Sequence, residues 1–350
     1  MEIHQILPNI VKGDAIGNET LLIRDILKEW GFKSEIYAQH IQPGIDAFPY
    51  LRYKQVSSKK NILIYHYSIG SDISDFIMEL SDKIILIYHN LTPEKYFWGV
   101  NDHIASLLRK GRDDLKKISK KVILALGDSE YNRQELQELG YLNTGVFPLV
   151  INFEKYSRIN EEILKHYEDH WINLLFVGRI APNKRQDDII KIFYYYKFTN
   201  PNSRLFLIGQ YQGFERYYRK LNDIIEQLSL PDIIILDNVS DEDLNAYYSI
   251  ADVFICMSEH EGFCIPLVES MFFGVPIIAN NATAIPQTLG DSGILVNKED
   301  YCIIAEIINE IIENKKLRDQ IVKKEKMRLR AFERPVVEDL FKKYIEMVTN

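Results

Sequence analysis

Short apolar, β-branched runs alternate with helical stretches along nearly the whole chain, and this alternation most constrains the fold. Continuous apolar runs suit strands that are covered on both faces. Strands that alternate with helices build parallel sheets through βαβ units. We therefore predict an α/β protein with two doubly wound, Rossmann-like sheets. The predicted strands are residues 2–7, 34–39, 61–68, 83–90, 121–129 and 144–150 in the first half, and 172–179, 203–210, 232–238, 252–258, 275–281 and 292–297 in the second.

The two sets of strands indicate two domains, which is also the usual outcome for a chain of 350 residues. A polar stretch, residues 151–170, separates them and is predicted to be the linker. The first domain is expected to comprise residues 1–150 and the C-terminal stretch 333–350, a proline-started amphipathic helix that crosses back. The second is expected to comprise residues 171–332. Parallel sheets bind ligands beyond the carboxyl ends of their strands, so functional residues should directly follow strands.

The composition excludes some functions. A net charge of −8 argues against a general nucleic-acid binder, which carries a basic face. No apolar run reaches the roughly 18 residues that span a bilayer, and no signal peptide is recognisable. The three cysteines, Cys256, Cys264 and Cys302, are odd in number and share no metal-ligand spacing. We predict reduced, buried thiols in a cytoplasmic protein.

The stretch FVGRIAPNKRQDD, residues 176–188, places Arg179 at a strand exit and Lys184 five residues later, where a helix is expected to begin. Backbone N–H groups and the positive end of the helix dipole attract anions at such a junction. Arginine adds a planar fork and lysine a point charge. The combination favours a diphosphate site; the alternative is a pair of solvated charges beside a Pro-Asn turn.

The stretch SEHEGFCIPLVESMFFGVPIIANN, residues 258–281, carries two glutamates eight positions apart. In one continuous helix they would lie roughly 80° apart around the axis, which suits one small site poorly. Pro266 is predicted to be the first residue of a helix that ends at Gly274, because its φ is fixed and it lacks an N–H. Glu261 is therefore predicted in the preceding loop and Glu269 in the first turns of the helix. The alternative for Glu269 is that it only complements the positive helix end.

The loop before this helix has the features of a ligand-binding turn. Gly262 permits close approach of the backbone, and the N–H groups of Gly262, Phe263 and Cys264 are predicted to donate to ligand oxygens. Glu261 is predicted to accept hydrogen bonds from hydroxyls at one end of a long ligand. Glu269 is predicted to take two vicinal hydroxyls at the other end, as acidic residues do for ribose in dinucleotide sites.

Taken together, E-G-F-x-x-P-x-x-E-S-M-x-x-G-x-P-I-I-A, preceded by F-V-G-R-x-x-x-x-K, resembles the retaining glycosyltransferases of family 4, the glycosyl transferases group 1, which have the two-domain GT-B fold. The resemblance covers almost all of the second domain. The first domain matches more loosely and resembles the subgroup that builds cell-surface polysaccharides. The segments that carry this looser match are residues 12–19, 88–97, 126–136 and 147–152.

The resemblance implies a role for each of these residues in binding a nucleotide-sugar donor. Arg179 and Lys184 would hold the diphosphate and stabilise it as it leaves. Glu269 would bind the ribose, and Glu261 would hold the donor sugar together with the adjacent backbone. The loop expected to meet the base contains Asn238 and Val239.

Two histidines that end strands are candidates in the first domain. The resemblance implies that His89 lies near the donor sugar and the attacking hydroxyl, as a positioning group, and His66 is its rival. A histidine at a strand end is often only a hydrogen-bonded part of the structure. In GDAIGN, residues 13–18, Gly17 is predicted to lie in a pliable loop whose helix end faces the second phosphate of the donor. The alternative is an ordinary βα turn.

The resemblance implies a hexosyltransferase with no cofactor, whose co-substrate is a nucleotide-diphosphate sugar, UDP or GDP. We predict no metal, because the cations at 179 and 184 would neutralise the diphosphate. The acidic triplet at residues 241–243 follows Ser240, a favourable N-cap residue, and is predicted to be the first turn of a helix.

The acceptor is predicted to be a saccharide or a lipid-linked saccharide. The basic segment LRKGRDDLKKISKK, residues 108–121, suggests peripheral contact with the inner face of the plasma membrane, against the alternative of a solvated helix face. Two other functions are open. One is a sugar-nucleotide epimerase of the same fold, and the other is a non-catalytic partner subunit that binds a nucleotide sugar.

Overall fold

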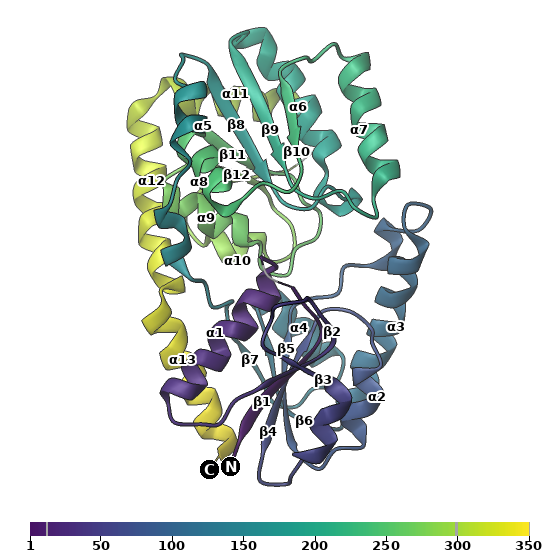
Figure 1. The fold of residues 1–350 in the computed structure, drawn as a ribbon. Helices are drawn as coiled ribbons and strands as arrows, with labels where there is room; N and C mark the ends of the chain where they lie inside the picture. Colours follow the sequence, from purple (N-terminus) through teal and green to yellow (C-terminus); the bar gives the residue numbers. More distant parts are fainter. Residues whose placement is uncertain (12, 298–299, 350) are drawn as a thin grey trace. The chain divides into compact units, whose positions relative to one another are not determined.

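The computed structural model describes residues 1–11, 13–297 and 300–349. Lys12, in the predicted loop before residue 13, and Asn350, the end of the predicted C-terminal helix, lie outside the described residues. The chain divides into two compact units (Figure 1). Unit 1 comprises Met1–Lys95, Asp102–Asn152 and Ala331–Asn350, and unit 2 comprises Tyr96–Asn101 and Phe153–Arg330.

Unit 1 is built around a parallel sheet of seven strands in the order β3-β2-β1-β4-β5-β6-β7. The strand order reverses at β1, which pairs with β2 on one side and with β4 on the other. The strands are β1 (Ile3–Ile10), β2 (Ile36–Ile41), β3 (Phe48–Pro49), β4 (Ile62–Tyr67), β5 (Lys83–Tyr88), β6 (Val122–Gly127) and β7 (Thr144–Val146). The helices are α1 (Ala15–Glu29), α2 (Ile73–Met78), α3 (Asp102–Ile118), α4 (Glu130–Glu138) and α13 (Arg334–Thr349), with short 3₁₀ turns at Tyr50–Gln55 and Glu94–Tyr96.

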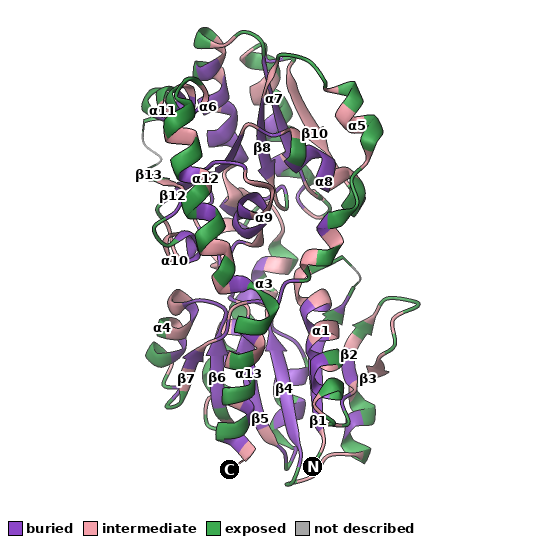
Figure 2. Cartoon of the chain, turned by 90° about the vertical axis from the view of Figure 1, so that its left-hand side faces the viewer, coloured by how far each residue is buried: buried purple, intermediate pink, exposed green. Residues whose placement is uncertain are grey.

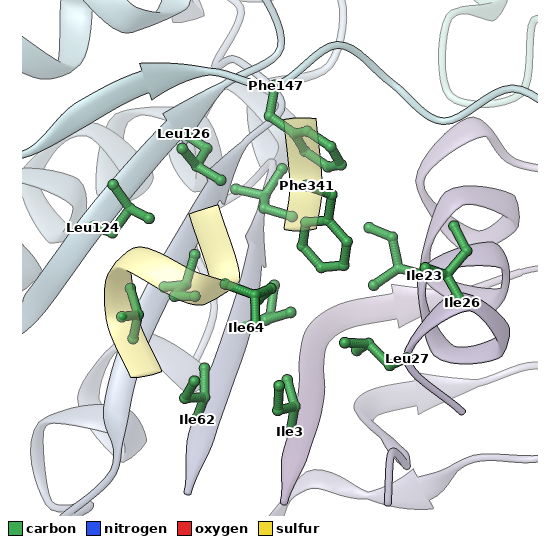
Figure 3. Close-up of a cluster of buried hydrophobic side chains, with 14 of the residues drawn as sticks. Ile3, Ile23, Ile26, Leu27, Ile62, Ile64, Leu124, Leu126, Phe147 and Phe341 are labelled. Atoms are coloured by element: carbon green, nitrogen blue, oxygen red, sulfur yellow. The ribbon is translucent and has the colours of Figure 1, made fainter. Parts of the chain in front are cut away.

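The C-terminal helix α13 completes the core of unit 1 (Figure 3). Its apolar side chains recur at helical spacing and pack with α1 and with strands of the sheet. Phe341 stacks on Phe147 at 5.1 Å between ring centroids. The predicted return of the last helix to the first domain is therefore found. The buried residues of α13 are Val337, Phe341, Ile345 and Val348.

Unit 2 contains a parallel sheet of six strands in the order β10-β9-β8-β11-β12-β13, and here the order reverses at β8. Strands of both sheets are largely buried (Figure 2). The strands are β8 (Ile172–Val177), β9 (Ser203–Ile208), β10 (Ile233–Leu236), β11 (Val253–Cys256), β12 (Ile277–Asn280) and β13 (Ile294–Val296). The helices are α5 (Glu161–His166), α6 (Gln186–Thr199), α7 (Glu215–Gln227), α8 (Asp241–Ile250), α9 (Ile265–Phe273), α10 (Ile285–Leu289), α11 (Tyr301–Glu313) and α12 (Lys315–Leu329), with 3₁₀ turns at Phe153–Ser157, Pro182–Lys184 and Arg330–Phe332.

The predicted α/β fold with two parallel sheets is confirmed. Every predicted strand is present, and β3 is a further strand of only two residues, which was not predicted. The predicted linker differs, because residues 153–170 form a 3₁₀ turn and α5 that belong to unit 2. The prediction of three buried thiols is wrong for Cys302, which is exposed near the start of α11.

Candidate functional site

The candidate donor site of unit 2 lies at the carboxyl end of its sheet, where the strand order reverses between β8 and β11. The loop after β8 contains Arg179 and Lys184, and the loop after β11 contains Glu261. Hydrogen bonds join the two loops, from the Glu259 N–H to the Asn183 carbonyl at 2.9 Å and from the Asn183 amide to the carbonyl of residue 260 at 3.2 Å. Parallel sheets bind ligands at such a switch point.

Lys184 and Glu261 form a close ion pair across this switch point. The Lys184 Nζ donates to Oε1 of Glu261 at 2.6 Å and to Oε2 at 2.7 Å. The side chains are 21% and 9% exposed, so the pair is only partly screened by water. Burial would lower the pKa of Lys184, but the Glu261 carboxylate outweighs it and the pKa is raised. Lys184 is therefore a fixed cation whose present counter-ion is a protein carboxylate.

Arg179 and Arg185 lie in the same loop but differ in their surroundings. Arg179 is exposed, and no partner of its guanidinium is found among the described residues, although its carbonyl accepts from the Gln186 amide at 2.9 Å. Arg185 instead forms ion pairs with Asp187, Asp188 and Glu259. Arg185 thus joins the loop after β8 to the loop after β11 through its ion pairs, while the Arg179 guanidinium is available to a ligand.

The turn after Glu261 leads directly into α9. The Glu261 N–H donates to the Thr283 hydroxyl at 2.9 Å, which fixes the start of the turn. Cys264 caps α9 with φ of 72°, a left-handed conformation that is unusual for a cysteine, and its side chain makes no capping hydrogen bond. Phe263 is buried, and its carbonyl accepts from Thr288 at 2.6 Å. Among the described residues, no acceptor is found for the backbone N–H of Gly262 or Cys264, the two groups predicted to face ligand oxygens together with Phe263.

Glu269 lies in α9, as predicted, and α9 ends at Gly274 with φ of 70°. The carboxylate of Glu269 already accepts hydrogen bonds from three protein side chains. Oε1 accepts from the Tyr156 hydroxyl at 2.9 Å and the Lys155 ammonium at 3.3 Å, and Oε2 accepts from the Tyr248 hydroxyl at 2.9 Å. These three donors were not identified from the sequence, since Lys155 and Tyr156 lie more than a hundred positions away. One further hydrogen bond to Oε2 is possible, because each carboxylate oxygen can accept two.

The loop predicted to meet the nucleotide base follows β10. Asn238 is exposed and has φ of 51°, and its Oδ1 accepts from the Gln210 amide at 2.6 Å. Val239 is half-buried. The loop thus turns through a left-handed residue beyond a strand end, and its contact with a base stays a prediction.

In unit 1, His89 and His66 belong to one buried hydrogen-bonded chain. The His89 Nδ1 lies 3.0 Å from Oδ2 of Asp128, and its Nε2 lies 3.0 Å from Nδ1 of His66. The His66 Nε2 lies 2.9 Å from Oε1 of Gln5. Glu19, from α1, places Oε2 at 3.7 Å from the His89 Nε2. The side chains of both histidines are at most 3% exposed.

The amide of Gln5 fixes the direction of these hydrogen bonds. The Gln5 Nε2 donates to the Thr20 carbonyl at 3.0 Å, so the Gln5 Oε1 must accept a hydrogen bond from the N–H at Nε2 of His66. A neutral His66 then has no hydrogen on Nδ1, and this nitrogen accepts a hydrogen bond from the N–H at Nε2 of His89. The other ring nitrogen of His89 is engaged with Asp128. Neither nitrogen of His89 is therefore free to accept a proton from an acceptor hydroxyl.

The electrostatics agree with this assignment. Burial would lower the pKa of His89, but the carboxylates of Asp128 and Glu19 outweigh it and raise the pKa to about 9. Burial and the charge of His89 hold the pKa of His66 well below its usual range. Burial raises the pKa of Glu19 to about 8, although His89 opposes this. His89 is accordingly a cation at neutral pH.

Gly17 does not lie in a loop. It occupies the first turn of α1, where its N–H donates to the carboxylate of the N-cap residue Asp14 at 3.3 Å. A Cβ at this position would lie 2.4 Å from the Val11 carbonyl oxygen, so the close approach of the chain requires glycine. The prediction of a pliable loop at Gly17 is therefore wrong, because the glycine serves packing.

The acidic triplet has the predicted structural role. Ser240 is the N-cap of α8, and its hydroxyl accepts from the Asp243 N–H at 3.1 Å. Three acidic side chains in a first turn complement the positive end of a helix. This placement accounts for the triplet without a metal.

The basic segment 108–121 lies mainly on α3, and three of its seven basic side chains form ion pairs within unit 1. Lys110 and Lys117 form ion pairs with Asp72 and Asp75 of the neighbouring α2 region, and Arg112 pairs with Glu135 at 2.5 Å. The exposed cations of the segment for which no partner is found among the described residues are Arg109, Lys116 and Lys120. None of the described helices is long and apolar enough to cross a bilayer.

Residues 157–328 match the family model described as glycosyl transferases group 1. The chain is 26% identical over 163 residues to the O-antigen chain mannosyltransferase B of Escherichia coli, covering 45% of this chain and 41% of that protein. It is 28% identical over 177 residues to the capsular polysaccharide biosynthesis glycosyltransferase CapM of Staphylococcus aureus, covering 49% of this chain and 45% of that protein. The matches thus span less than half the length of these relatives.

Two solved structures share the fold over nearly the whole chain. The sucrose-phosphate synthase of Thermosynechococcus elongatus has a TM-score of 0.78 at 15% identity and covers 99% of both chains. Anabaena Alr3699/HepE, solved in complex with UDP-glucose, has a TM-score of 0.77 at 15% identity and covers 99% of this chain and 100% of its own. The predicted GT-B class is thereby confirmed. Residues 157–328, just under half of the chain, are thus similar to the glycosyl transferases group 1.

Proposed function

We propose that the protein is a retaining, metal-independent hexosyltransferase of cell-surface polysaccharide synthesis. It would move a sugar from a nucleotide-diphosphate sugar, with UDP or GDP as the nucleotide, to a saccharide or lipid-linked saccharide acceptor. The observation that carries the proposal is the Lys184–Glu261 pair beside the exposed Arg179 at the switch point of the unit 2 sheet. Its polysaccharide-building relatives support the acceptor class.

The ion pair suggests how the donor binds. The diphosphate would replace Glu261 as the counter-ion of Lys184, with Arg179 adding a second cation. Glu261 would then be released to accept hydrogen bonds from hydroxyls of the donor sugar. Exchanging one anion for another keeps the partly buried cation compensated, which avoids the high free-energy cost of an unpaired charge.

In the transfer step, the bond between the anomeric carbon and the phosphate oxygen breaks, and the electron pair leaves with the diphosphate. The acceptor oxygen forms the new bond, and its proton passes to an oxygen of the departing diphosphate, because both ring nitrogens of His89 are engaged. Lys184 and Arg179 are proposed to stabilise the negative charge that develops on the leaving group. Stabilisation by fixed cations is the basis for proposing that no metal is needed.

The remaining residues are proposed to position the donor. Glu269 would bind the ribose through the remaining capacity of Oε2, or in exchange for a tyrosine. The backbone at Asn238 and Val239 would meet the base. His89 is proposed to act as a buried, fixed cation and not as a general base, because both ring nitrogens are engaged within unit 1.

The first experiment is a thermal unfolding screen with UDP-, GDP- and ADP-sugars. A donor present at about 100 times its Kd should stabilise the folded protein by about 2.7 kcal/mol. Glu269→Ala should mainly weaken this stabilisation. The absence of a shift with every nucleotide sugar would contradict the proposed donor site.

The second experiment distinguishes the alternatives by NMR. A transferase releases nucleotide diphosphate only when an acceptor is present and retains the anomeric configuration in its product. An epimerase would interconvert the donor sugar alone, and a non-catalytic subunit would bind the donor without turnover. A rate that collapses on addition of EDTA would contradict metal independence.

Membrane contact through α3 can be tested by sedimentation with anionic liposomes. Arg109→Glu combined with Lys116→Glu should abolish binding if these exposed cations dock on the lipid surface. Lys315→Glu combined with Lys316→Glu on α12 is the control, because it makes the same change in net charge in unit 2. Equal binding of both variants would remove the support for contact through residues 108–121.

A further inference from the structure

A buried pair of thiols lies directly beside the Lys184–Glu261 pair. Cys256 ends β11 and Cys264 begins α9, so the turn that carries Glu261 closes on itself and brings them together. Their Sγ atoms are 3.9 Å apart, and both side chains are buried. The spacing of the two cysteines in the chain matches no metal motif, so only the folded turn reveals the pair.

A carboxylate completes a three-ligand cluster. The Sγ atoms of Cys256 and Cys264 and one carboxylate oxygen of Glu261 all lie within 4.8 Å of one another. We propose that Cys256, Cys264 and Glu261 form a binding site for a soft divalent cation such as Zn²⁺. The cation would take no part in the transfer reaction, for which no metal is proposed.

The sulfur separation suits a metal better than a disulfide. Two thiolates at about 2.3 Å from a tetrahedral Zn²⁺ are about 3.8 Å apart. A disulfide requires the sulfur atoms to approach to about 2.05 Å. The observed 3.9 Å therefore needs almost no movement of the two sulfur atoms for metal binding. Two sulfur ligands and one oxygen ligand also leave a fourth position open, as in zinc sites with three protein ligands.

The charges of the cluster balance with and without the cation. Without it, two neutral thiols accompany the Lys184 ammonium and the Glu261 carboxylate, which sum to zero. With it, two thiolates, one carboxylate, one ammonium and a divalent cation also sum to zero. Because Glu261 offers two oxygens, one can bind the cation while the other keeps its hydrogen bond to Lys184. Net charge therefore does not oppose binding in this buried place.

Binding here would block the donor site, a consequence that rests on the proposed function. Glu261 held by the cation and by Lys184 could not turn to the donor sugar, and Lys184 would stay occupied. Soft cations are thus expected to inhibit transfer, whereas Mg²⁺ and Ca²⁺ are not, because they prefer oxygen ligands. Inhibition by soft cations would therefore depend on the thiols of Cys256 and Cys264, and not on the cationic side chains of the diphosphate site.

The test is a titration of the full, reduced chain with Cd²⁺, followed by the ultraviolet absorption of cadmium–thiolate bonds. One cation should bind per chain. Cys256→Ser and Cys264→Ser should each raise the Kd for Cd²⁺ at least about 100-fold. This is more than the loss of a residue that only hydrogen-bonds to a metal ligand. Cys302→Ser is the matched control, because this exposed thiol is not part of the cluster, and it should titrate like the unchanged protein.

Three results would overturn the site. The first is a cadmium–thiolate absorption band that is lost in Cys302→Ser. The second is an unchanged Kd for Cd²⁺ in the Cys256/Cys264 double variant, and the third is no Cd²⁺ binding by the unchanged protein. Thermal unfolding identifies any variant that fails to fold, and Cys256→Ala and Cys264→Ala then replace the serine variants. A second arm compares inhibition by Zn²⁺ in the unchanged protein and in Cys256→Ser, each relative to its own rate without metal. Since cadmium binding needs no activity, a failed transfer assay would count against the proposed function and leave the binding result intact.

Discussion

The charged groups of the two units are arranged in contrasting ways. In unit 1, His66 and His89 have partners at both ring nitrogens and are at most 3% exposed. In unit 2, Lys184 is 21% exposed and holds one carboxylate, and Arg179 is exposed. The first arrangement is satisfied internally and resists change, whereas the second can exchange its counter-ion for a ligand. A stable hydrogen-bonded chain therefore needs a protein partner for every polar group, whereas an anion site needs cations whose protein partners can be replaced.

The largest effect is expected at Lys184. Lys184→Ala should lower the transfer rate about 10³-fold, or about 4 kcal/mol, because a preorganised cation is lost and Glu261 is left unpaired. Steady-state kinetics with the preferred donor measures this. Lys191→Ala, which removes a more exposed lysine of α6, is the control and should leave the rate unchanged. A near-normal rate for Lys184→Ala would abolish the contrast between the two units.

The pH dependence of stability should reveal the cation in unit 1. The folded pKa of His89, about 9, lies above its unfolded value of 6.5, so its contribution is complete below pH 6.5 and is lost as pH rises towards 9. The loss should be of the order of 3 kcal/mol relative to His89→Gln, which does not titrate. Urea unfolding of both proteins at pH 6 and pH 9 measures it. Asp128→Asn, which removes a neighbouring carboxylate, should move the loss to lower pH, and parallel profiles for all three would show that His89 is not charged.

Arg179→Ala separates ligand binding from stability. The rate should fall about 10²-fold, or about 2.7 kcal/mol, because the leaving group loses one cation. The midpoint of thermal unfolding without ligand should stay within about 1 °C, because the guanidinium is exposed. A drop in stability as large as that of Lys184→Ala would mean that Arg179 has a structural role instead.

The smallest effect is expected around Glu269. Tyr156→Phe and Tyr248→Phe each remove one hydrogen bond to its carboxylate, at a cost of about 1 kcal/mol in the free energy of unfolding. If the ribose replaces one of these hydroxyls, the corresponding variant should bind donor more tightly, while its partner should not. Calorimetry with nucleotide diphosphate compares them. Weaker binding in both variants would indicate that the tyrosines orient Glu269 for the ribose.

Local patterns carried much of the prediction. The apolar runs revealed the long strands, and Pro266 and Gly274 marked the ends of α9 through their backbone preferences. The same reasoning missed β3, since two residues make no pattern. It also misassigned Gly17, because the approach of the Val11 carbonyl that excludes a side chain is a tertiary contact.

The sequence by itself determined the α/β class, the parallel sheets and the residue types at the strand ends, because these depend on short-range periodicity and turn chemistry. Only the tertiary structure decided which strand ends are neighbours. Strand order sets Lys184 against Glu261 across β8 and β11, and it joins His89 to His66 and Gln5 across β5, β4 and β1. These contacts depend on packing between segments far apart in the chain, for which local sequence carries no signal. The approach of Cys256 to Cys264, eight positions apart, depends instead on the folded backbone of the turn after β11.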